Sequence, residues 1–343
     1  MEPILCICIS SYNKSNRLEK LVKEILKFQS TKISVVVVDD NSSDDTKMRI
    51  SKIEDKRLQF YQNSSNKGGR ENWYESIKHG RGKYILHLLD RDWIQIGYLK
   101  TLVDILEHEE AGFGYVGNIF SLAQSKNEVI EYYRAGSEAL EKFAFVLVHP
   151  SGFFVKRSVW ENIHNKEQFF RKKGYGIYPH SYIFAIMSKE YTGMLIHYPL
   201  IKMQVSFAKY KSEFYKKNKE NVPYWWTPEA HKMELIALTR YAYKYMNLPM
   251  ETLRKILIFR FNENLKASTI IYRDIAKDRY NAKHYGLESE YIDEKELIII
   301  NWKFVFYYIM FLIRECIGIL NFKLLIDVLC IGIQNQRDIC IWE

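Results

Sequence analysis

The fold of this chain is decided in one stretch, Lys83-Tyr84-Ile85-Leu86-His87-Leu88-Leu89-Asp90-Arg91-Asp92-Trp93. Its apolar half has β character and follows Gly80-Arg81-Gly82, which predicts a strand buried on both faces of a parallel sheet. The strand stops at Asp90 and Asp92. Because open α/β sheets bind ligands beyond the carboxyl ends of their strands, and carboxylate oxygens suit Mg²⁺ or Mn²⁺, this end predicts a metal shared with a diphosphate. The alternative is that both Asp residues only start a loop and cap the next helix.

The residues upstream predict a β-α-β unit. Residues 3–10 and 33–38 are short apolar runs, and the second contains four consecutive valines, which suit a strand without a solvated face. Between them, apolar residues recur at the spacing of one helical face: Leu18, Leu21, Val22, Ile25 and Leu26. Such a unit is right-handed, with both strand ends at one edge of the sheet.

The second strand also ends in acids, at Asp39-Asp40 within the polar run 39–46. This run could be a loop that caps a helix over residues 47–53. Its position favours a functional reading, because it opens onto the same edge of the sheet as Asp90 and Asp92.

The amino-acid composition limits the classes of protein to which this chain can belong. The chain has 343 residues, 47% of them hydrophobic, which excludes a disordered chain. The net charge of +9 suits an anionic partner such as nucleic acid, a nucleotide-sugar or the inner membrane surface, and selects none of them. Five cysteines show no zinc-type spacing and no disulfide framework. The apolar run 4–9 is too short for a signal peptide, so we expect a cytoplasmic protein.

Four segments in order carry a family resemblance: residues 9–14 (Ile-Ser-Ser-Tyr-Asn-Lys), 35–45, 66–72 (Asn-Lys-Gly-Gly-Arg-Glu-Asn) and 82–92. Together they resemble the signature of family-2 glycosyltransferases with the GT-A fold, over about residues 3–205. The resemblance implies an α/β fold of the GT-A type, with a Rossmann-like, mostly parallel sheet flanked by helices. A helical C-terminal region follows the resembling part.

The resemblance also implies residue roles. Ser10 and Tyr12 would line the base and ribose of a nucleotide, and Asp40 would accept a hydrogen bond from a uracil or thymine imide. Arg70 would lie by the base or the diphosphate. Asp90 would face the ribose or donor sugar, and Asp92 would coordinate Mn²⁺ or Mg²⁺. Arg91 departs from the small or acidic residue usual at its position, and would either contact phosphate or neutralise local charge.

The general base is where the chain departs from the family. Family members commonly supply an Asp or Glu about 90 to 100 residues beyond the metal-binding Asp, but this chain has no carboxylate between Glu167 and Glu190. His180 stands in that place, and its ordinary pKa suits proton abstraction in an inverting transferase. His180 could equally cap a helix or contact the acceptor, in an enzyme that works by retention or takes its base from elsewhere.

An earlier segment, residues 148–160, resembles the acceptor side of the family. His149 and Ser151 could touch a sugar there. The alternative is a turn built from Pro150, Ser151 and Gly152.

The expected organisation has three parts: a catalytic domain over residues 1–205, a basic aromatic lid or linker over 206–228, and a helical region over 229–343. Helical periodicity covers residues 229–245, 250–261 and 264–277. The apolar run 297–313 is marginal for a bilayer of about 30 Å. It suits a helix at a membrane interface, or else a buried core or homodimer surface.

The resemblance implies a metal-dependent, inverting glycosyltransferase from a bacterium, which we expect to be peripheral at the inner face of the plasma membrane. It would move a sugar from a UDP- or dTDP-type donor to a glycan or lipid-linked glycan, in capsule, O-antigen or exopolysaccharide synthesis. No motif supports a nucleic-acid partner. One alternative is a catalytically silent nucleotide-sugar binder or membrane scaffold. Another is a sugar nucleotidyltransferase, although residues 10–17 lack the glycine of its phosphate loop.

Overall fold

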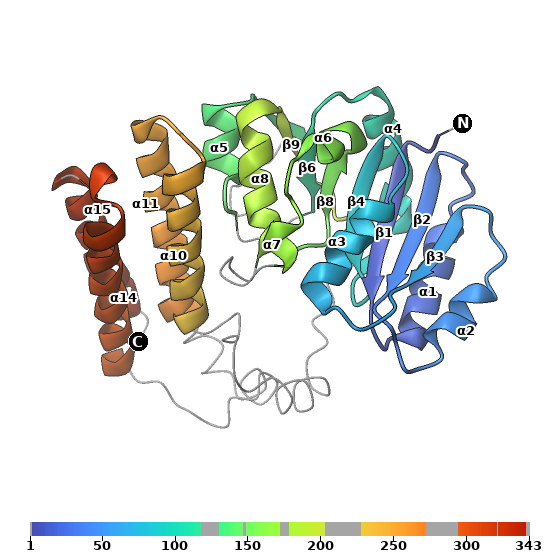
Figure 1. Cartoon of the computed structure of the whole chain (residues 1–343), viewed down its shortest axis with the longest axis horizontal. Coiled ribbons are helices and arrows are strands. Elements are labelled where there is room, and N and C mark those ends of the chain that lie inside the picture. The colour runs from blue at the N-terminus through green and yellow to red at the C-terminus, as the bar shows by residue number, and fades with distance from the viewer. Residues whose placement is uncertain are drawn as a thin grey trace. The chain divides into compact units, whose positions relative to one another are not determined.

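A computed structural model describes residues 2–117, 130–146, 149–171, 178–202, 228–271, 294–320 and 322–340. The chain divides into two compact units, Met1–Lys173 with Pro179–Val205, and Gly174–Tyr178 with Ser206–Glu343. Figure 1 shows the first unit as a sheet with helices and the second as helices. The lid predicted over residues 206–228 lies outside the described residues, except for its last position.

The first unit is built on a mixed, mostly parallel sheet. The described strands are β1 Leu5–Ser11, β2 Ile33–Asp39, β3 Leu58–Gln62, β4 Tyr84–Leu89, β6 Phe113–Val116, β7 Ile130–Tyr133, β8 Phe153–Lys156 and β9 Gly193–Ile196. They lie in the order β3-β2-β1-β4-β8-β6-β9-β7. The expectation that β4 lies between parallel strands holds on one side only: β4 runs parallel to β1 and antiparallel to β8.

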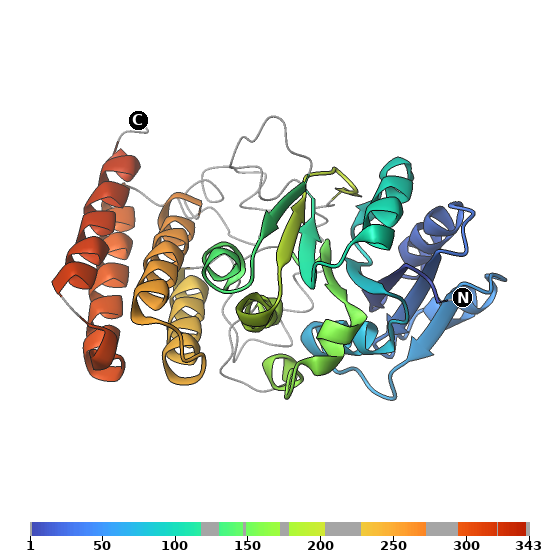
Figure 2. The ribbon, with the colours of Figure 1, turned by 90° about the horizontal axis from the view of Figure 1, so that it is seen from above.

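Helices cover both faces of this sheet (Figure 2). One face packs against α1 Ser15–Leu26 and α4 Ile96–His108 in one apolar core. The predicted stripe of α1 is buried. The other face packs against α3 Gly69–His79, α5 Ser137–Phe143, α7 Gln168–Arg171 and α8 Pro179–Glu190, largely through aromatic rings such as Trp73 and Phe184. Shorter elements are α2 Thr46–Ser51, α6 Arg157–Asn162, and β5 Trp93–Ile94 paired with β10 Ile201–Lys202.

The direction in which strands are added to the sheet reverses between β1 and β4. The chain leaves β1 toward β2 and β3 on one side, and β4 pairs with the other side of β1. Ligands of open α/β sheets bind at such a switch point, outside the carboxyl ends of the strands. Because β8 is antiparallel to β4, the turn before β8 lies at this same edge.

The second unit is helical. Its described helices are α10 Pro228–Tyr245, α11 Met250–Lys266, the π-helical turn Ala267–Ile271, α14 Glu294–Glu315, the 3₁₀ turn η3 Ile317–Ile319 and α15 Phe322–Cys340. The break expected after residue 261 is wrong: α11 continues to Lys266, since neither glycine nor proline interrupts the chain there. Within the described part of the chain, α14 alone is long and apolar enough to cross a membrane, judged by length and composition.

Candidate active site

The ends of β1 and β4 are joined through Asp90. The Ser11 hydroxyl donates to Asp90 Oδ2 at 2.8 Å, and the backbone N–H of Tyr12 donates to the same oxygen at 3.3 Å. Burial raises the pKa of Asp90, and the hydrogen bonds from Ser11 and Tyr12 oppose this. Tyr12 is 37% exposed, so part of its side chain is open to solvent.

Ser10 lies on the other side of β1. It is buried, and its hydroxyl lies 3.2 Å from His87 Nε2 on β4. Burial lowers the pKa of His87 well below its usual range, so this imidazole is neutral. The structure therefore brings Tyr12 and Asp90 together at the edge, while the Ser10 side chain reaches into the interior.

Asp40 organises the loop that precedes α3. Its carboxylate is buried and accepts three hydrogen bonds, from Asn63 Nδ2 at 2.8 Å, from the Lys67 N–H at 2.9 Å and from the Gly68 N–H at 2.8 Å. The sequence pattern singled out Asp40 for the nucleotide base. In the structure both of its oxygens hold the loop that would border such a base.

Two further residues, which the sequence analysis did not assign, tie the loops at this edge together. Asn72 on α3 donates through Nδ2 to the carbonyls of Ser11 and Val38, each at 3.2 Å. Asp44 accepts from the N–H of Ser15 and from that of Thr46, each at 3.0 Å, so one carboxylate holds the first turns of α1 and α2. Both lie inside the quoted motifs, but which loops they join depends on the tertiary fold.

Asp92 is a fully enclosed acid at this edge. It is 0% exposed, and its Oδ2 lies 2.5 Å from both His149 Nε2 and Ser151 Oγ. Burial alone would raise the pKa of Asp92, but the His149 and Ser151 contacts and the charge of Arg91 bring it below its ordinary value. Asp92 is therefore ionised at neutral pH.

The residues fit a divalent cation held mainly by the substrate. Across the described ranges, no three His, Cys, Asp or Glu side chains come together in a cluster that could enclose an ion. A buried, ionised carboxylate such as Asp92 is what a Mg²⁺-type ion uses when phosphates and water fill its other positions.

Three predicted residues remain: Arg70, Arg91 and His180. Arg70 on α3 donates to the backbone carbonyl of Phe169 on α7, and Arg91 is exposed beside Asp92. His180, in the first turn of α8, is 1% exposed, with its ring centroid 5.3 Å from that of Trp73 and 6.3 Å from that of Phe184. The roles of these three side chains stay predictions.

Comparison with known proteins agrees with this architecture. The family model described as "Glycosyl transferase family 2" matches residues 6–192, which include β4 and all but the first residue of β1. The chain belongs to glycosyltransferase family 2. This membership replaces the nucleotidyltransferase alternative.

Two curated relatives of this family-2 chain are bacterial enzymes. The "GalNAc(5)-diNAcBac-PP-undecaprenol beta-1,3-glucosyltransferase" of Campylobacter jejuni is 28% identical over 177 residues, covering 49% of this chain and 56% of the relative. The "UDP-Glc:alpha-D-GlcNAc-diphosphoundecaprenol beta-1,3-glucosyltransferase WfaP" of Escherichia coli is 28% identical over 112 residues, covering 33% of this chain and 45% of the relative. The chain thus spans about half the length of the curated relatives it matches.

Solved structures show the same fold. S. aureus TarS superposes with a TM-score of 0.53 at 15% identity, covering 98% of this chain and 54% of TarS. The mannosyltransferase PcManGT from Pyrobaculum calidifontis, solved with GDP-Man and Mn²⁺, gives a TM-score of 0.52 at 15% identity, covering 98% of this chain and 88% of that one. The family-2 chain therefore has the GT-A fold expected from its motifs.

Proposed function

We propose that this family-2 glycosyltransferase moves a sugar from a nucleoside diphosphate donor, of the UDP or dTDP type, to a hydroxyl of a lipid-linked glycan. One observation carries the proposal: two acids separated by a single residue, Asp90 and Asp92, end β4 at the switch point of the sheet. The printed names of both curated relatives include an undecaprenol-linked acceptor, which supports the acceptor class. Synthesis of a bacterial surface polysaccharide is the matching context.

Each residue at this edge of the sheet would bind a different part of the donor. Tyr12 and the loop held by Asp40 would border the nucleoside, and Asp90 would accept hydrogen bonds from the hydroxyls of the ribose or the donor sugar. The enclosed Asp92 would hold the divalent cation against the diphosphate. A cation there neutralises the charge of the departing nucleoside diphosphate as a Lewis acid.

The acceptor hydroxyl must lose a proton, and His180 is the sequence candidate for the group that takes it. Its imidazole is enclosed between Trp73 and Phe184, so an acceptor would reach it only after the covering residues move. Under this proposal the reaction inverts the anomeric centre. If His180→Gln transfers sugar at a near-normal rate, the imidazole is a packing group and the base lies elsewhere.

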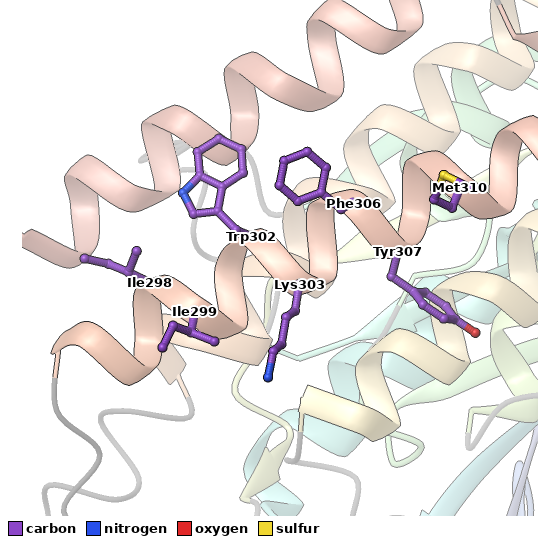
Figure 3. A pocket seen from close by; sticks show the side chains of 7 residues that line it. All are labelled: Ile298, Ile299, Trp302, Lys303, Phe306, Tyr307 and Met310. Carbon is purple, nitrogen blue, oxygen red and sulfur yellow. The ribbon is translucent and has the colours of Figure 1, made fainter.

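Membrane contact is the second part of the proposal, and α14 of the helical unit would provide it. Large apolar side chains point outward along this helix: Ile299, Phe306, Tyr307, Met310, Ile313 and Ile317 just beyond its end. Four of them line an apolar groove together with Ile298, Trp302 and Lys303 (Figure 3): Ile299, Phe306, Tyr307 and Met310. Lys295, Lys303 and Arg314 are exposed on the same helix, as is the acid Glu296, so cations and apolar side chains are both available for an anionic bilayer.

The deciding experiment is binding followed by transfer. The melting temperature of the purified chain would be measured with UDP, dTDP, GDP, CMP and ADP, each with and without Mn²⁺, because a ligand of the native state raises it by mass action. We expect a metal-dependent increase with one pyrimidine diphosphate and loss of that increase in Asp92→Asn, each increase being measured from the melting temperature of the same protein without ligand. The matching radiolabelled nucleotide-sugar is then incubated with a polyprenyl diphosphate glycan. Nucleotide binding without transfer or donor hydrolysis would favour the silent binder instead.

A further inference from the structure

Asp92 meets a second side chain that is able to bind a metal ion. His149 Nε2 and Asp92 Oδ2 lie 2.5 Å apart although the two residues are 57 positions apart in the sequence. His149 comes from the turn before β8, and Asp92 from the loop after β4. Asp92 is 0% exposed and the His149 side chain 17% exposed, so the imidazole is the more exposed member of the pair.

We propose that His149 is the second protein ligand of the divalent cation at Asp92, and that this nitrogen makes the enzyme prefer Mn²⁺ to Mg²⁺. The inference rests on the proposed function, since it assigns a ligand within the same site. Mg²⁺ takes oxygen ligands almost throughout, whereas imidazole nitrogen is accepted more readily by transition-metal ions. A His–Asp pair therefore favours Mn²⁺ over Mg²⁺ more strongly than two carboxylates would.

The two donor atoms are close enough to share an ion. His149 Nε2 and Asp92 Oδ2 lie 2.5 Å apart as a hydrogen-bonded pair, so the imidazole would turn from the carboxylate toward the ion when one binds. Neighbouring ligands of a Mg²⁺-type ion are roughly 3 Å apart, so the two atoms would need to separate only slightly. Diphosphate oxygens and water would supply the remaining ligands.

The turn that carries His149 is anchored to the sheet at several points. Leu89 donates its backbone N–H to Ser151 Oγ at 2.9 Å, and the Gly152 N–H donates to the His87 carbonyl at 3.1 Å. The Tyr115 hydroxyl donates to the Ser151 carbonyl at 2.8 Å. Hydrogen bonds behind the ligands orient metal sites in this way and raise their affinity. The turn is thus built to hold His149 against Asp92 before any ion arrives.

A different role for His149 would be to donate a hydrogen bond that orients Asp92. The substitution His149→Gln separates the two roles. Its amide N–H₂ reaches about as far as Nε2 and still donates to Asp92, but the amide nitrogen does not coordinate metals. The nitrogen ligand is lost in this variant, whereas a hydrogen-bond donor is preserved. The amide oxygen that remains is a hard ligand, which gives no preference for Mn²⁺ over Mg²⁺.

Pulsed electron paramagnetic resonance of Mn²⁺ bound with UDP would test this directly. In the full-length wild-type chain we expect electron-spin-echo modulation from an imidazole nitrogen, and its disappearance in His149→Gln. Titration of Mn²⁺ and of Mg²⁺ should show the ratio of their affinities falling about tenfold or more, a loss of roughly 1.4 kcal/mol in discrimination. His164→Gln, which changes an exposed histidine on another loop, is the matched control.

Two results would overturn the inference. One is a wild-type Mn²⁺ spectrum without nitrogen modulation. The other is an unchanged ratio of metal affinities in His149→Gln while Asp92→Asn abolishes metal binding. Both leave the proposed function standing, because Asp92 would then bind the ion without His149. If neither variant changes Mn²⁺ binding, or if no nucleotide binds at all, the proposed function fails together with the inference.

Discussion

Asp40 shows how one buried acid can decide the shape of a binding site. Its three hydrogen bonds hold the loop before α3, and in Asp40→Asn one carboxylate oxygen becomes an amide that faces N–H donors. We expect the free energy of unfolding to fall by about 2 kcal/mol, since buried donors lose their acceptor. Urea denaturation followed by circular dichroism measures this change.

The same variant separates two roles of Asp40 in binding. If Asp40 only shapes the loop, Asp40→Asn weakens the binding of UDP and CDP by the same factor. If the carboxylate also accepts a hydrogen bond from the uracil imide, the binding of UDP is weakened more than that of CDP, because cytosine N3 carries no hydrogen. A variant with wild-type stability would contradict the loop role.

His231 makes the stability of the helical unit depend on pH. This histidine is buried on α10, and burial lowers its pKa to about 4, although a hydrogen bond with Asn264 opposes the shift. The unfolded chain, with a pKa near 6.5, binds more protons between these values. Stability is therefore fully present above about pH 6.5 and falls as the pH is lowered toward 4.

The size of this effect can be measured against a variant. For these two pKa values, the free energy of unfolding should fall by about 2 kcal/mol between pH 7 and pH 5 because of His231 alone. The neutral His87 of the first unit also lowers the free energy of unfolding as the pH falls. The contribution of His231 is therefore the difference in pH dependence between wild type and His231→Leu, measured by urea denaturation. Identical pH dependence in both proteins would show that His231 ionises normally.

At the level of single residues, the sequence predicts which positions matter better than it predicts what each side chain touches. Asp90 and Asp92 end their strand as expected, because strand termini follow from local pattern. The Ser10 side chain reaches His87 instead of the edge, since the alternation along β1 sends Ser10 and Ser11 to opposite faces. The pairing of Asp92 with His149 depends on where β8 joins the sheet, and no local pattern encodes that.

Among the elements, the turn before β8 is the one most constrained by its surroundings. Gly152 has a φ of +103°, and a Cβ at this position would lie 2.4 Å from the Val116 carbonyl oxygen. Gly152→Ala should therefore lose about 3 kcal/mol or more, from backbone strain and from a clash with rigid backbone. The displaced turn should also weaken Mn²⁺ binding, because it carries His149 and Ser151.

Gly136 provides the matched control for this prediction. It also has a positive φ, of +90°, but nothing lies within 4 Å of its added Cβ. Gly136→Ala should then show only the conformational cost, of about 1 kcal/mol. Equal losses in the two variants, compared by thermal unfolding, would mean that the contact with Val116 is relieved by a small shift.

The elements of the sheet were predicted where they are long and apolar. The first two strands and β4 follow from their apolar runs, and α1 follows from its periodicity. The short strand β3 was not identified, because its mixture of polar and apolar residues half exposes it at the sheet edge. The antiparallel entry of β8 beside β4 was not expected either, since strand direction is a property of the tertiary fold.

For the whole molecule, charge and apolar surface point to the same partner. The chain carries a net charge of +9, and exposed cations accompany the apolar side chains of α14. A membrane surface rich in anionic lipid satisfies both, since cations lie at the headgroups while apolar side chains enter below them. A second copy of this chain would also cover the apolar side chains of α14, so the two partners must be distinguished by experiment.

Sedimentation of the full chain with vesicles of phosphatidylglycerol and phosphatidylethanolamine tests this partner. Phe306 and Met310 are 57% and 62% exposed on α14, and changing both to Gln should reduce vesicle binding about tenfold, because burial of two large apolar side chains is lost. The control changes Phe259 and Met250 of α11, which are 51% and 40% exposed, in the same way. Binding should also fall as salt is raised, because the lysines and arginine contribute by charge. If the α14 variant binds vesicles like wild type and light scattering shows that it alone has become monomeric, the apolar side chains of α14 form a homodimer interface instead.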